Sequence, residues 1–166
     1  MSEVLEVRIA SGSDDAEELL TNGRMDMNST DLDMGYAENV PQMSGLRFTG
    51  IDIPEGAIIT SAYLQFTAEE TGVDAATFVF RGELSPDAAQ FTSSNGNITS
   101  RTKTDASVSW SPAAWDQVGE AGADQRTPDI SAIIQEIVDQ QGWQENNALV
   151  LTVSGTGHRA PMTYED

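Results

Sequence analysis

The chain contains no cysteine and only one histidine. The absence of cysteine excludes disulfide bonds, thiolate catalysis and thiolate metal sites. With His158 as its only histidine, the chain cannot form a histidine-rich zinc site. A Ser-His-Asp triad would depend wholly on that residue, and no Gly-x-Ser-x-Gly motif accompanies it. The sequence therefore favours a protein that is not an enzyme.

Basic residues are also scarce. Eight Lys and Arg stand against 27 Asp and Glu, the net charge is −19, and Lys103 is the only lysine. Nucleic acid is excluded as a partner because phosphate binding needs clustered cations. A surface this acidic stays soluble in salt, which fits a marine bacterium as the source, although solubility alone explains it equally well.

Long apolar runs are missing as well. No stretch approaches the ~20 apolar residues of a membrane span, so we expect no membrane insertion. A length of 166 residues suits one domain with its own core. The first residues do not resemble a signal peptide. We therefore expect residues 1–166 to be a single module, either cytosolic or cut from a larger secreted protein.

Short runs of alternating apolar residues, separated by turns rich in Gly, Asn and Ser, predict many half-buried strands. These runs are Leu5/Val7/Ile9, Met25/Met27, Leu46/Phe48, Ala62/Leu64/Phe66, Phe78/Phe80 and Val108/Trp110. The apolar run 148–153 predicts a central strand. Together they predict an all-β fold, a β-sandwich of the jelly-roll type.

One segment has helical periodicity instead. Its apolar residues recur at i, i+3, i+4, i+7 and i+8, which predicts an amphipathic helix at about 128–141. Thr127 can cap its start, and Gly142 can end it.

Carboxylates cluster near the N-terminus and are the candidate metal ligands. Like charges this dense repel each other, and calcium relieves the repulsion because it binds six to eight oxygens in flexible geometry. The candidates are Asp14, Asp15, Glu17, Glu18, Asp31, Asp33 and Glu69. Alternation along a strand places Asp15 with Glu17 and Asp14 with Glu18 on opposite faces, so only part of the set can meet one ion. A solvated acidic edge that discourages aggregation is the alternative.

Three residues are candidates for binding a sugar ligand. Trp110 and Trp143 are expected to pack inside, whereas Trp115 follows Ser111-Pro112-Ala113-Ala114 on a loop and is the best candidate for an exposed ring. Tyr36 lies in a predicted loop, 35–43, where binding residues often reside. Arg101 could pair with a sugar carboxylate, although on so acidic a chain most arginines are expected to pair internally.

Six strings of the sequence are informative together: SDDAEE (13–18), STDLDM (29–34), IPEGAIITSAYLQFTAEE (53–70), SVSWSPAAW (107–115), DQRTPDISAIIQEIV (124–138) and NALVLTVSGTGHR (147–159). With them the sequence resembles a bacterial secreted module related to jelly rolls of the DNRLRE type, and the resemblance covers nearly the whole chain. The resemblance implies a jelly-roll sandwich, an extracellular or cell-surface location and a non-enzymatic role. Some relatives bind acidic polysaccharides.

Modules of this kind usually continue beyond the equivalent of Thr163 and Tyr164 to a further apolar strand, whereas this sequence stops at Asp166. We therefore expect an open C-terminal sheet edge, which strand exchange or self-association could fill.

Two functional hypotheses follow. The first is a calcium-stabilised module that binds a polysaccharide or cell-surface glycan, or serves in adhesion. The second is a structural spacer or assembly domain that uses its sheet edges and binds no sugar.

Overall fold

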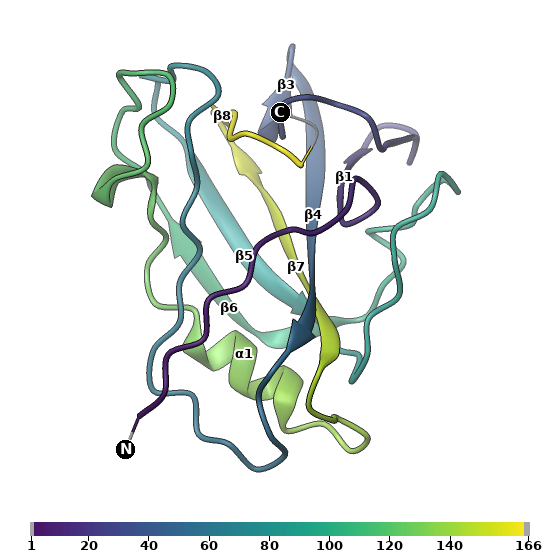
Figure 1. Cartoon of the computed structure of the whole chain (residues 1–166). Helices are drawn as coiled ribbons and strands as arrows, with labels where there is room; N and C mark the ends of the chain where they lie inside the picture. Colours follow the sequence, from purple (N-terminus) through teal and green to yellow (C-terminus); the bar gives the residue numbers. More distant parts are fainter. Residues whose placement is uncertain (1, 165–166) are drawn as a thin grey trace.

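A computed structural model describes residues 2–164. The chain forms one antiparallel sheet faced by a layer of extended, mostly irregular segments (Figure 1). The strands of the sheet run in the order β2-β1-β4-β7-β5-β6, and a shorter pair, β3 and β8, attaches to β4 through β3. An all-β fold with a single helix is therefore confirmed.

The long central strands are those that the alternation predicted. The elements are β1 (Asp15–Leu19), β2 (Met25–Asp26), β3 (Met34–Ala37), β4 (Val40–Ile51), β5 (Thr77–Glu83), β6 (Lys103–Trp110), the 3-10 turn η1 (Ala123–Gln125), α1 (Ser131–Val138), β7 (Asn147–Thr156) and β8 (His158–Arg159). The predicted apolar central strand lies within β7, where residues 148–153 are all buried between β4 and β5.

The helix α1 is shorter than predicted because its expected cap serves another segment. The Thr127 hydroxyl accepts a hydrogen bond from the backbone N–H of Leu64 at 3.0 Å instead of capping the helix. The N-cap residue is Ile130, which has no capping side chain, and the carboxylate of the preceding Asp129 accepts from the N–H of Ser131 at 2.9 Å. The predicted apolar stripe of α1 is buried against β5 and β6.

Two predicted strands are extended but do not form regular ladders. The segment 61–68 bonds along one edge to residues 119–130, and several of these bonds go to side chains. On its other edge, within the described residues, only Thr67 and Ala68 pair, with Pro161 and Met162. Residues 2–10 make no backbone–backbone hydrogen bond within the described chain. Both segments cross the face of the sheet in Figure 1 and contribute apolar side chains to its core.

The main core lies between the sheet and this second layer. Five of its aromatic rings form a contiguous group in which Trp110 lies 6.0–6.4 Å, centroid to centroid, from Phe66, Phe78, Phe80 and Trp115. A smaller cluster, formed by Ala16, Met25, Ala88, Phe91, Ile98 and Val150, lies on the other face of the sheet. No helix in the described part of the chain is long and apolar enough to span a bilayer.

Candidate cation-binding site

The acidic string of the N-terminal region lies just before and within β1, and its carboxylates are buried. Asp14, Asp15, Glu17 and Glu18 expose 2%, 5%, 5% and 2% of their surface. The alternative interpretation, a solvated acidic edge, is therefore wrong for these four residues. Buried carboxylates need partners, and each of the four has found at least one.

Asp14 and Glu18 are committed to internal contacts on one side of the sheet. Asp14 forms an ion pair with Arg47 at 2.7 Å, beside the smaller core cluster. Glu18 accepts from the N–H groups of Ile98 and Thr99 at 2.8 Å and from the Thr99 hydroxyl at 2.6 Å. Glu18 therefore ties the loop 84–102 to β1 directly, and Asp14 does so through Arg47, whose Nε donates to the carbonyl of Ala88 at 2.8 Å.

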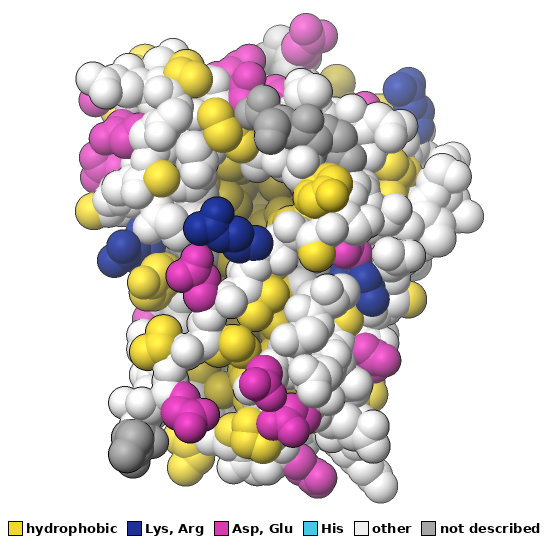
Figure 2. All heavy atoms as spheres, in the orientation of Figure 1, with side chains coloured by type: hydrophobic (Ala, Val, Ile, Leu, Met, Phe, Trp, Pro, Cys, Tyr) yellow, Lys and Arg dark blue, Asp and Glu magenta, His cyan; other side chains and the backbone are white. Residues whose placement is uncertain are grey.

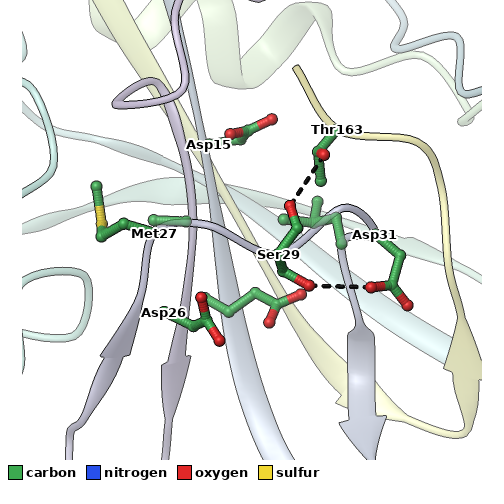
Figure 3. Close-up of a pocket in the computed structure, with 9 residues that line it drawn as sticks. Asp15, Asp26, Met27, Ser29, Asp31 and Thr163 are labelled. Carbon is green, nitrogen blue, oxygen red and sulfur yellow. Dashed lines mark hydrogen bonds between the residues drawn. The ribbon is translucent and has the colours of Figure 1, made fainter. Parts of the chain in front are cut away.

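Asp15 and Glu17 face the other side, toward the C-terminal segment and the segment before β3. One Asp15 oxygen accepts from the N–H of Tyr164 at 2.8 Å, and a Glu17 oxygen accepts from the N–H of Asp33. Together with Asp26 and Asp31 they line a hollow of about 10 Å³, close to the volume that one water-sized particle requires. Figure 3 shows Asp15, Asp26 and Asp31 approaching this hollow from separate segments, with Ser29 and Thr163 between them.

The acidity of Glu17 is strongly perturbed. Burial raises its pKa to about 8, the N–H bond from Asp33 lowers it in part, and the nearby charges of Asp33, Asp26 and Asp31 raise it further. At neutral pH this carboxyl is therefore mostly protonated, which removes one negative charge from the crowded region.

A second group of acids surrounds Asp31 at the point where three segments meet. Carboxylate oxygens of Asp31, Glu69 and Glu70 lie within 4.8 Å of one another, and we call this group the acidic junction. The backbone of Asp31 bridges to Met162, and the N–H of Glu69 donates to the carbonyl of Ala160 at 2.9 Å. The junction therefore joins the segment before β3, the segment after Ala68 and the C-terminal segment.

Only part of the predicted ligand set converges there. Asp31 and Glu69 come together, whereas Asp33 bonds to His158 at 2.5 Å. That hydrogen bond raises the pKa of His158, and burial offsets part of the rise. Glu70, the neighbour of Glu69 in the sequence, completes the group although it is not in the predicted ligand set. The chain bends at both residues, and this bend brings the two carboxylates to the same side.

The three candidates for sugar binding do not form a site. Trp115 is 0% exposed, and its indole N–H donates to the carbonyl of Asp124 at 2.9 Å, so the expectation of an exposed ring is wrong. It is buried because its loop pairs with Gly72 through two backbone hydrogen bonds, which turn the side chain into the core. Tyr36 lies in β3 and is half-buried.

Arg101 is held entirely by internal contacts. Its guanidinium donates to Glu83 at 2.8 Å, to Asn97 and to two further carbonyls, and it stacks on the Phe91 ring with its central carbon 4.6 Å from the centroid. Its donors therefore serve the packing of the loop 84–102, in line with the general expectation that arginines pair internally.

The chain matches no protein-family model, and no curated protein is similar to it in sequence.

Proposed function

We propose that this domain is a non-catalytic structural module of a secreted or cell-surface protein and that it uses calcium as a structural ion. The observation that carries the proposal is the position of its carboxylates at junctions between segments. Asp14 and Glu18 hold the loop 84–102, Asp15 holds the C-terminal segment, and the acidic junction lies where three segments meet.

The acidic junction is the place where calcium would act. Three carboxylates this close repel one another, and a divalent ion that bridges them replaces repulsion with attraction. Calcium suits the site because it accepts carboxylate and carbonyl oxygens in flexible geometry. An ion there would tie Asp31 to the segment after Ala68 and would strengthen the contact that both make with residues 160–162.

A role in assembly or spacing is favoured over glycan binding. Trp110, Trp115 and Trp143 expose 7%, 0% and 1% of their surface, so none of them offers a ring on which a sugar can stack. Tyr63, which is exposed, carries the Arg126 guanidinium over its ring at 4.5 Å. We therefore expect no binding on a glycan array, and specific calcium-dependent retention of a glycan there would favour the adhesion hypothesis instead.

The calcium proposal is tested by thermal unfolding with and without the ion. At a calcium concentration 100 times the dissociation constant, binding stabilises the fold by about 2.7 kcal/mol, which raises the melting temperature by roughly 5–10 °C. Glu70→Gln should abolish most of this rise. Glu55→Gln, which changes an exposed acid in a distant turn, is the matched control and should keep it.

Two outcomes would contradict the proposal. One is a shift of less than about one degree in the unaltered protein at millimolar calcium. The other is a shift of equal size in Glu70→Gln and the unaltered protein, which would place the ion elsewhere.

A further inference from the structure

Residues 61–65 of the second layer have a backbone edge that pairs with no other described residue. The even-numbered residues of the segment 61–67 bond to the segment 119–130: Phe66 donates to Gln125 at 2.9 Å, and the carbonyl of Leu64 accepts from Thr127 at 3.0 Å. Because strand residues alternate, the N–H and C=O groups of Ser61, Tyr63 and Gln65 face the opposite way. Within the described residues those groups accept and donate no backbone hydrogen bond.

The N-terminal segment crosses the same face but does not close this edge. Residues 2–10 make no backbone–backbone hydrogen bond within the described chain, although Val7 and Ile9 pack against the main core. Ala62 and Leu64, which point inward, remain only half-buried. Figure 2 shows apolar atoms exposed in a hollow on this face. The apolar core is therefore incompletely covered next to the unpaired backbone N–H and C=O groups of this edge.

The C-terminal segment already starts a ladder along this edge. Pro161 bridges Ala68 in antiparallel fashion, and the N–H of Met162 donates to the carbonyl of Thr67 at 2.9 Å. The chain then leaves the edge, because the N–H of Tyr164 bonds to Asp15. A strand that continued the same ladder would run antiparallel to residues 67–61 and would meet Gln65, Tyr63 and Ser61 in turn.

From this geometry we propose that the edge of residues 61–67 takes up an extended strand from another polypeptide, antiparallel to it and lying between it and the N-terminal segment. The strand is apolar at alternate positions, because those side chains would cover the half-buried Ala62, Leu64 and Val7. Its outward positions are polar or basic, because the domain carries a net charge of −19. This inference goes beyond the structural role proposed above and does not depend on calcium.

The test uses the full chain, in chelator, and a synthetic ten-residue peptide with valine at alternate positions and lysine or threonine between them. We expect one peptide to bind each protein molecule in calorimetry. Hydrogen exchange should slow at the amides of Ser61, Tyr63 and Gln65, which donate to no residue in the described range 2–164. The amides of Leu64 and Phe66, already bonded, serve as internal controls and should change less.

Two methylated versions of the peptide supply the matched control. Methylating the backbone nitrogens of only the odd or only the even residues removes the donors from one edge of the peptide and leaves its side chains unchanged. Because a single edge of the peptide would face residues 61–67, one version should bind at least ~10-fold more weakly than the other.

The inference would be overturned by the absence of binding at millimolar peptide, by equal affinity of the two methylated versions, or by slow exchange of Ser61, Tyr63 and Gln65 in the peptide-free monomer. The last result would show that the N-terminal segment closes the edge by itself. A stable dimer in light scattering, with the same amides protected, would mean that a second copy is the occupant and would also overturn it.

Discussion

Replacing Glu17 by glutamine should make the protein more stable at neutral pH and flatten the dependence of its stability on pH. The pKa of the Glu17 carboxyl is about 8 in the folded protein against an ordinary value of 4.5, chiefly because the group is buried. Below pH 4.5 the carboxyl is protonated in both states and contributes no pH dependence. Between pH 4.5 and pH 8 the folded state keeps a proton that the unfolded state releases, so stability falls as the pH rises.

The magnitude follows from that difference in pKa. Each pH unit inside the window costs about 1.4 kcal/mol, so the unaltered protein should lose roughly 2.5–3 kcal/mol from this residue between pH 5 and pH 7. Glutamine carries no charge at any of these pH values, and its carbonyl can accept the same bond from the Asp33 N–H. At pH 5 the free energy of unfolding of Glu17→Gln should therefore be closer to that of the unaltered protein. At pH 7 it should be higher by roughly 2.5–3 kcal/mol.

Urea unfolding followed by tryptophan fluorescence measures this effect, since all three tryptophans are buried in the folded state. The titration should be made in chelator at constant ionic strength, because bound cations and changes in screening would alter the carboxylate energies. Glu55→Gln controls for the loss of one negative charge at an exposed position. If the difference in unfolding free energy between Glu17→Gln and the unaltered protein were the same at pH 5 and pH 7, the argument from burial would be refuted.

Three further predictions concern contacts away from Glu17. Arg47→Met should lower the free energy of unfolding by roughly 3–5 kcal/mol in urea titrations, because it leaves the Asp14 carboxylate buried without its cation. Trp115→Ala should cost about 3–5 kcal/mol in the same assay, as expected for a core ring, and a cost below about 1 kcal/mol would place this side chain on the surface. In an NMR titration His158 should lose its proton above pH 6.5, and Asp33→Asn should lower that midpoint; an unchanged midpoint would contradict the pairing.

Local pattern was enough to predict the sheet and the helix because both are recorded in the spacing of apolar residues. The alternation at Leu46 and Phe48 and at Phe78 and Phe80 marks strands that the structure contains, and the stripe from Ile130 marks α1. The segment 61–68 was less predictable. It alternates like a strand, but its partners are partly side chains, and that choice depends on residues about 65 positions away, such as Thr127 and Asp129.

The candidate site was predictable only in its composition. The sequence shows that many acids lie near the N-terminus, but their burial depends on partners that are distant in the chain. Asp14 meets Arg47 across 33 positions, and Asp33 meets His158 across 125. The burial of Trp115 also depends on a distant contact. The sequence of its loop suggests an exposed ring, but the pairing of that loop with Gly72 turns the ring into the core.

The two proposed binding events meet on one segment, so each should influence the other. Thr67, whose carbonyl accepts from Met162, borders the unpaired edge, and Glu69 and Glu70 of the acidic junction follow two and three residues later. An ion that fixes Glu69 and Glu70 also restrains the ladder formed by Ala68 and Pro161, from which the incoming strand would extend. Because the ion already restrains this segment, the segment loses less conformational entropy when the strand binds.

Calcium should therefore tighten peptide binding, and the peptide should tighten calcium binding by the same factor, since coupling between two sites is reciprocal. Calorimetry of each ligand in the presence and absence of the other measures both factors, and a coupling of about 1 kcal/mol would appear as roughly a fivefold change in affinity. Glu70→Gln should remove the effect of calcium on the peptide while leaving peptide binding in chelator unchanged. Equal peptide affinity with and without calcium, in a protein shown to bind both, would mean that the junction and the edge act separately.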